Sequence, residues 1–398
     1  MPNVRAGVRS KGAAARYRDG CVWAAARTIA AVSMLATSAL LAQASRRTAL
    51  PDRLSDSAFW ALSAQLSEPA GYFRSDNLVG NEVTLQHPIP DLMAATPRGG
   101  VYIGVGPDQN FTYIAALRPR IAFVVDIRRL NVMQHLFYKA LFELSPSRAD
   151  FLERLFARPR PAGLDTTVSA QRLMGAFASV TADSGLYRRS LGEIRDHLTR
   201  THRFPLSDEE FAGIEYVSNA FLDAGPDLTY NFGTGRGGWG GRRFMPSYGT
   251  MMTETDTSGV AHSYLASEEA FRFLRDLEER NLIVPVTGDF GGPQALQAVG
   301  AWVRDHGATV TAMYTSNVEQ YLFQSDSGWR RFFENVATFP TTPHSTFIRA
   351  IFNMGYRFSS GTSGPRSVTL LCPIDRHVQA YREGALQSYA DLSSCPVR

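Results

Sequence analysis

Cysteine is scarce in this chain of 398 residues, which contains three. Cys-x-x-Cys pairs and zinc-type spacing are both absent, which excludes the common cysteine-based metal motifs. Cys21 lies near the N-terminus, so Cys372 and Cys395 remain as an even pair. In an oxidising compartment this pair would form a disulfide that ties the last predicted strand to the tail. Two free thiols are the alternative.

Motifs of several common enzyme classes are also missing. The glycine-rich stretch 231–244 is not followed by Gly-Lys-Ser/Thr, so it is not a P-loop. It is either an active-site lid or a plain surface loop. Without a Gly-x-Ser-x-Gly elbow, an α/β-hydrolase would lack its nucleophile. His87, His135, His262 and His344 show no ligand spacing, so we predict no metal site.

Positive charge is concentrated at the start of the chain. The formal net charge is +4, but residues 1–44 alone carry a net +5, which leaves −1 for the remainder. A near-neutral body argues against a nucleic-acid partner, because phosphate backbones are bound mainly through clustered Lys and Arg side chains.

The same N-terminal residues have the pattern of an export signal. A basic region precedes the apolar stretch 28–44, which ends in Ala42-Gln43-Ala44, the small-x-small pattern that signal peptidase needs. We predict a signal peptide over 1–44, cleaved after Ala44, and a periplasmic or secreted protein. An uncleaved anchor and an unstructured extension are the alternatives. No second long apolar run follows, so we expect no membrane span after cleavage.

Strand-like and helix-like segments alternate through most of the remaining chain. Residues 101–105 and 120–127 are continuous apolar strands, as expected where helices cover both faces of a sheet. A short helix over 108–118 joins them, and an amphipathic helix over 130–144 follows. Such a crossover predicts a parallel sheet.

The rest of the chain extends this α/β pattern. Four further strands are predicted, at 282–287, 308–315, 346–352 and 367–372. The last two predict an antiparallel hairpin at a sheet edge. We predict a helix and polar loop over 45–95, followed by a Rossmann-like domain over 96–398. A helical insertion interrupts this domain at about 145–225.

The turn after the first strand has the pattern of a nucleotide site. Gly104 and Gly106 would let a ligand approach the backbone where a Cβ would clash. The helix behind them offers free N–H groups, and Gln109 at its start either faces the ligand or caps the helix. Asp126 ends the second strand, where a carboxylate typically accepts hydrogen bonds from ribose hydroxyls.

This arrangement resembles the class I S-adenosylmethionine-dependent methyltransferases. Residues 101–106 match the family's first motif, Asp126 matches its ribose acid, and the late hairpin suits its antiparallel seventh strand. Asp289 follows the strand that we match to the family's fourth, which implies a place near the transferred methyl group. The resemblance implies S-adenosylmethionine as the cofactor. Two positions depart from the pattern. Tyr102 stands where the family usually has an acid, and Asp108 stands where a third glycine is expected, so its carboxylate would crowd the cofactor's own.

Polar residues ahead of the first strand complete the predicted site. Asp76 and Glu82 are candidates for a general base or a sugar ligand, or they hydrogen-bond their own loop. Together with Asp289 they form the predicted catalytic set. We therefore expect an exported methyltransferase-like protein with a cleft for a small nucleoside ligand. The alternatives are a non-catalytic envelope binding protein and an NAD-dependent oxidoreductase, although the latter would need a glycine in place of Gln109.

Overall fold

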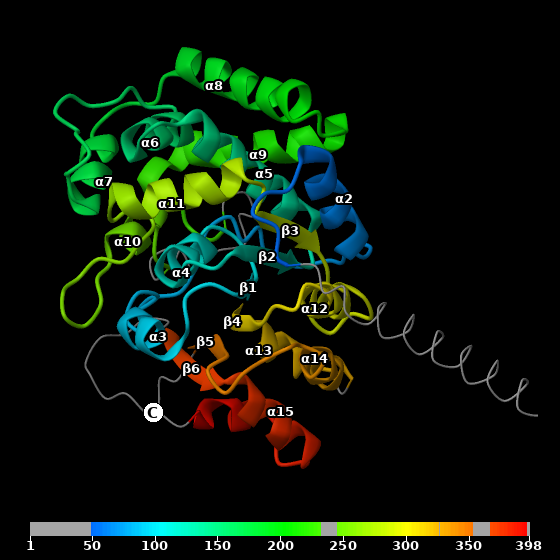
Figure 1. Cartoon of the computed structure of the whole chain (residues 1–398). Coiled ribbons are helices and arrows are strands. Elements are labelled where there is room, and N and C mark those ends of the chain that lie inside the picture. Colours follow the sequence, from blue (N-terminus) through cyan, green and yellow to red (C-terminus); the bar gives the residue numbers. More distant parts are fainter. Residues whose placement is uncertain (1–48, 232–244, 326, 353–366, 396–398) are drawn as a thin grey trace, which may run out of the picture. The chain divides into compact units, whose positions relative to one another are not determined.

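The computed structural model describes residues 49–231, 245–325, 327–352 and 367–395 (Figure 1). The predicted export signal lies outside these residues, as does nearly all of the glycine-rich stretch. Within them, no helix has the length and apolar character needed to cross a bilayer.

A six-stranded, mostly parallel sheet organises the described chain. Its strand order is β3-β2-β1-β4-β5-β6, in which β1 to β5 run parallel and β6 pairs antiparallel with β5. The strands are β1 (Val101–Gly104), β2 (Ile121–Asp126), β3 (Ile283–Thr287), β4 (Val310–Ser316), β5 (Thr346–Phe352) and β6 (Ser367–Pro373). The predicted α/β class and the C-terminal hairpin are confirmed.

Helices cover both faces of this sheet. Figure 1 shows the strands between α4 (Gln109–Leu117), α5 (Arg129–Leu144) and α11 (Glu268–Glu279) on one side, and α12 (Ala295–Asp305) and α14 (Gly328–Val336) on the other. Every residue of β1 and β2 is buried as a result. This double coverage explains why both strands are apolar without alternation.

The remaining helices complete the described structure. They are α2 (Asp56–Leu66), α3 (Ile89–Ala95), α6 (Arg148–Phe156), α7 (Ala170–Ala178), α8 (Ser184–Asp196), the π-helix η1 (His197–Thr201), α9 (Asp208–Ala224), η2 (Gly225–Asp227), α10 (Tyr248–Thr253), α13 (Val318–Leu322), α15 (Ile374–Arg382) and η4 (Tyr389–Ser394). Ser55 caps α2 by accepting a hydrogen bond from the Ala58 amide. Helix α3 is not predicted by the sequence pattern.

The helix α5 is buried all round, whereas its sequence predicts an exposed polar face. All residues from Asn131 to Phe142 are buried, including Lys139. The reason is tertiary: α9 and α11 pack on α5 on the sides away from the sheet. Its polar side chains therefore find partners in the interior or remain without one.

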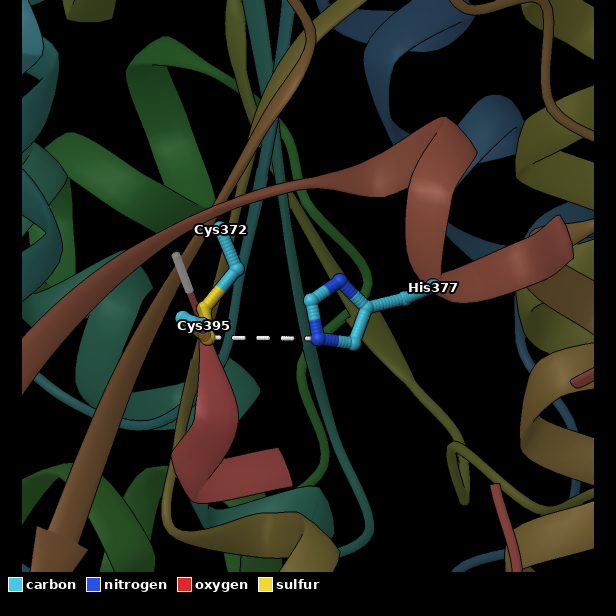
Figure 2. A group of neighbouring side chains, drawn as sticks. All are labelled: Cys372, His377 and Cys395. Carbon is cyan, nitrogen blue, oxygen red and sulfur yellow. Dashed lines mark hydrogen bonds between the residues drawn. A yellow bond between two sulfur atoms is a disulfide. The ribbon is translucent and has the colours of Figure 1, made fainter. Parts of the chain in front are cut away.

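A disulfide closes the C-terminal part of the fold. Cys372 in β6 is bonded to Cys395, which follows η4, and their Cα atoms are 5.4 Å apart. Figure 2 shows the His377 ring of α15 directed at this bond, with its Nε2 3.9 Å from the Cys395 sulfur. Of the two alternatives that the sequence leaves open, the structure contains the bridged form.

Candidate functional site

A cavity of about 350 Å³ opens at the carboxyl ends of β1 to β4. Strands β2 and β4 flank β1 on opposite sides, so the strand order reverses there. Open α/β sheets bind ligands at this position, and we name this space the switch-point cavity. Its walls include Tyr72, Phe73, Asn77, Asn81, Gly106, Gln109, Asp126, Arg128, Tyr230, Asp289, Phe290, Ser316, Asn317, Tyr321 and Arg331. A further cavity, of about 550 Å³, lies against β6 and contains none of the predicted site residues.

The two glycines after β1 have different roles. Gly106 lines the cavity with a φ of +77°, a backbone conformation that favours glycine. Gly104 does not line it. A Cβ at Gly104 would lie 1.9 Å from the Asn110 side-chain oxygen, so this glycine makes room for Asn110 rather than for a ligand. The Asn110 amide donates hydrogen bonds to the carbonyls of Val105, Gly106 and Pro107, which fixes the turn.

Asp126 lines the cavity but is already paired. Its Oδ1 accepts hydrogen bonds from the backbone N–H and Nε of Arg128, at 2.9 and 3.0 Å, and its Oδ2 accepts one from Nη2 at 2.9 Å. A carboxylate oxygen offers about two acceptor positions, so Oδ2 keeps one for a ligand. Arg128 also donates to the backbone carbonyl of Asp76. The pair therefore presents both an acceptor and a buried guanidinium to the cavity.

Asp289 lines the cavity after the predicted strand 282–287, but this strand has a different place in the sheet from the one the resemblance implies. It follows β3 at the sheet edge, whereas the strand beside β1 is β4, which ends at Ser316. Matching Asp289 to the fourth strand was therefore wrong. A long helical segment separates β2 from β3. Because of it, the order of the strands in the sequence does not determine where each strand lies in the sheet.

An internal carboxylate occupies the turn around Asp289. Glu68 accepts hydrogen bonds from the backbone N–H groups of Asp289, Gln294 and Ala295, at 2.7, 3.0 and 3.3 Å. The Gln294 and Ala295 N–H groups lie at the start of α12, where free N–H groups attract anions. Glu68 supplies this anion, so a side chain of the protein already occupies the N–H groups of this glycine-containing turn.

Glu82 lies beneath the cavity instead of in its wall. Its Oε1 accepts hydrogen bonds from the hydroxyls of Tyr314, at 2.5 Å, and Ser316. The Gln109 amide, which lines the cavity, donates in turn to the Tyr314 hydroxyl at 3.2 Å. Burial raises the pKa of Glu82 to about 7, although the bonds from Ser316 and Tyr314 act to lower it. Ser316 has a φ of +49° and reaches the cavity from the end of β4.

Asp76 and Asp108 are not among the cavity-lining residues either. Asp76 contributes its backbone carbonyl to Arg128, and its backbone N–H donates to the Asn231 side-chain oxygen at 3.3 Å. Asp108 is fully buried, so the predicted crowding of a ligand by this carboxylate is not observed. Neither Asp108 oxygen has a hydrogen-bond partner among the described residues. Burial raises the pKa of Asp108 to about 7.

A family model described as Domain of unknown function (DUF7790) matches residues 78–204 and 241–370. The chain belongs to this family. The match includes Gly106, Asp126 and Ser316, whereas Tyr72 and Phe73 in the cavity wall lie outside it. The family's description makes no reference to methyltransferases. None of the curated proteins compared with the chain matches it.

Several cavity residues are not predicted from the sequence. Ser316 is absent from the predicted set, although it directly follows the predicted strand 308–315. The aromatic residues Tyr72 and Phe73 lie in a polar, turn-rich loop, and the sequence carries no signal that they form a wall. Arg331 comes from α14, which lies far along the chain from β1. Only folding brings it to the cavity.

Proposed function

We propose that the protein binds a nucleoside-type small molecule in the switch-point cavity, with S-adenosylmethionine as the first candidate. The main observation behind the proposal is that Gly106 and Asp126 line the same cavity. This cavity lies at the strand ends where such ligands bind. The cavity volume of about 350 Å³ falls within the range of small-molecule sites.

The residues that line the cavity are of the types that bind such a ligand. Gly106 leaves the backbone open to close approach, because a Cβ at this position would meet only the side-chain ends of Asn77 and Gln109, both at 3.5 Å. Tyr72 and Phe73 offer aromatic surface for a base. The free position on the Asp126 Oδ2 accepts one ribose hydroxyl.

The charged wall residues fit a ligand that also carries an anionic group. Arg128 and Arg331 both line the cavity, and a guanidinium pairs readily with carboxylate or phosphate. S-adenosylmethionine has a carboxylate and would supply an activated methyl group. Asp289 and Ser316 also face the cavity, and Glu82 stands behind Ser316.

A binding function without chemistry is the second candidate. Of the three acids in the predicted catalytic set, Asp76 and Glu82 are not in the cavity wall. Export, if the predicted signal acts, would also remove the chain from the cytoplasm, where S-adenosylmethionine is made. Sequencing the mature N-terminus tests that point, because cleavage after Ala44 favours the binding function.

Ligand binding is tested by thermal unfolding of the full chain with S-adenosylmethionine, S-adenosylhomocysteine or NAD. A ligand at one hundred times its Kd should stabilise the protein by about 2.7 kcal/mol. We expect a response to the two sulfur compounds that Asp126→Asn removes and that Asp305→Asn, on the exposed end of α12, retains. A response to NAD alone would favour the oxidoreductase, and no response to any of the three would refute the proposal.

A further inference from the structure

Two histidines and a glutamate, none of them a predicted site residue, converge in the structure. The Glu143 Oε2 lies 2.5 Å from the His197 Nε2 and 2.6 Å from the His202 Nε2. The two Nε2 atoms are 3.3 Å apart. We name these three residues the His–Glu cluster. It shares no residue with the switch-point cavity.

We propose that the His–Glu cluster is a binding site for a divalent transition metal, with Zn²⁺ as the best match. Two imidazoles and one carboxylate are a ligand set that Zn²⁺ takes in three-ligand sites. Zn–N bonds of about 2.0–2.1 Å at a tetrahedral angle place two nitrogens about 3.3 Å apart. The two histidine nitrogens already have this separation. The carboxylate oxygen would have to withdraw by less than about 1 Å to complete the same geometry.

The backbone between the histidines explains how they come together. Residues five apart on an α-helix lie about 140° apart around its axis and cannot share a ligand. Here the segment from His197 to Thr201 is a π-helix, and the His202 amide donates to the His197 carbonyl at 3.0 Å. This i to i+5 bond brings both rings to one side. Arg203 follows with a φ of +58°, so the chain turns sharply after the second ligand. Single π-helical turns of this kind are frequent at functional sites.

Neighbouring charges hold two of the three ligand residues, His202 and Glu143, in place. The Asp56 Oδ1 lies 2.8 Å from the His202 Nδ1, which orients the ring so that its Nε2 faces the cluster. Carboxylate–histidine pairs of this kind support metal ligands in many sites. Lys139 donates to the Glu143 Oε1 at 2.6 Å, which leaves Oε2 for the metal. The side chains of Glu143 and His202 are only 6% and 10% exposed.

The cluster also has access to solvent. A cavity of about 560 Å³ includes Asp56, Thr201 and His202 in its wall. A metal held by three protein ligands at this wall would keep its remaining coordination position open to water or another small ligand. The described chain has a second group of potential metal ligands, formed by Cys372, His377 and Cys395. This group offers no comparable site, because its two sulfurs are joined in a disulfide (Figure 2).

The test uses the untagged full chain, stripped with a chelator and kept under non-reducing conditions so that the disulfide persists. Isothermal titration with Zn²⁺ and elemental analysis after dialysis measure affinity and stoichiometry. We expect one equivalent per chain for the wild type. Co²⁺ substituted at the same site should show the intense visible absorption of tetrahedral coordination.

Three variants and a control make the result specific. His197→Ala and Glu143→Gln should remove the bound equivalent, and Asp56→Asn should weaken affinity by about 10- to 100-fold. His344→Ala, on an exposed histidine, should bind as the wild type does. Circular dichroism confirms that each variant is folded before titration. If the wild type binds no Zn²⁺, or if folded His197→Ala and Glu143→Gln bind it equally well, the cluster is an ion-pair network only and the proposal fails.

Discussion

The surroundings of Asp108 differ from those predicted. It stands at the start of α4, where the resembled family has a glycine, yet its side chain lies in the interior. Both of its oxygens lack hydrogen-bond partners among the described residues. A buried carboxyl without a partner favours its neutral form, which is why its pKa rises from 3.8 to about 7.

This shift predicts a pH-dependent stability. Between about pH 4 and pH 7 the folded state keeps the proton on Asp108 and the unfolded chain releases it, so the free energy of unfolding falls as the pH rises. Asp108→Asn cannot ionise. At pH 8 it should be more stable than the wild type by on the order of 4 kcal/mol, and near pH 4 the two should be alike. Urea denaturation at the two pH values measures the difference, with Asp305→Asn as the control. Equal stability at pH 8 would show that Asp108 is not held neutral in the fold.

At the scale of elements, the start of α12 depends on a residue from a distant part of the sequence. Glu68 lies just after α2 and satisfies three N–H groups in the turn between β3 and α12. This contact ties α2 to the sheet edge and holds the backbone of Asp289 at the cavity. The sequence shows a glycine-containing turn and cannot show which acid fills it.

Glu68→Gln is the matching test. The amide keeps one acceptor oxygen and turns an NH₂ group toward the remaining N–H donors, so we expect a loss of about 1–2 kcal/mol in the free energy of unfolding. Glu269→Gln is the control, because the Glu269 side chain is 78% exposed in its pair with Arg118. Exposed pairs of this kind change stability by less than about 1 kcal/mol. Urea unfolding of both variants at pH 7 separates the two cases, and equal losses would mean that Glu68 does not hold the turn.

At the scale of the whole molecule, the disulfide fastens the antiparallel edge of the sheet to the end of the described chain. It joins residues separated by 23 positions. A cross-link of that length is expected to stabilise a fold by about 3 kcal/mol, mainly by restricting the unfolded chain. Disulfides persist mainly in oxidising compartments, and export stays a prediction.

The Cys372→Ser/Cys395→Ser variant should therefore unfold at a lower denaturant concentration, by an amount that corresponds to about 3 kcal/mol. Reducing the wild type should produce the same loss. Asp305→Asn serves as the control, since this exposed substitution keeps both cysteines and should leave the midpoint unchanged. If reduction leaves the unfolding midpoint unchanged, the bridge does not contribute to stability.

The sequence by itself determined the local elements and the chemistry of single positions. Continuous apolar runs predict β1 and β2, because a strand covered on both faces has no polar side. The salt bridge between Asp126 and Arg128 is local in the same sense, because a single residue separates the two in sequence.

Only the tertiary structure decided how these parts meet. The lateral place of β3, and with it that of Asp289, depends on where a long helical segment returns the chain to the sheet. Glu82 was predicted as a site residue, yet whether it faces the cavity or lies beneath it is set by the packing of Tyr314 and Ser316. The physical reason is common to these cases. Strand and helix character follows from interactions among near neighbours, whereas burial and contact depend on surfaces supplied by distant segments.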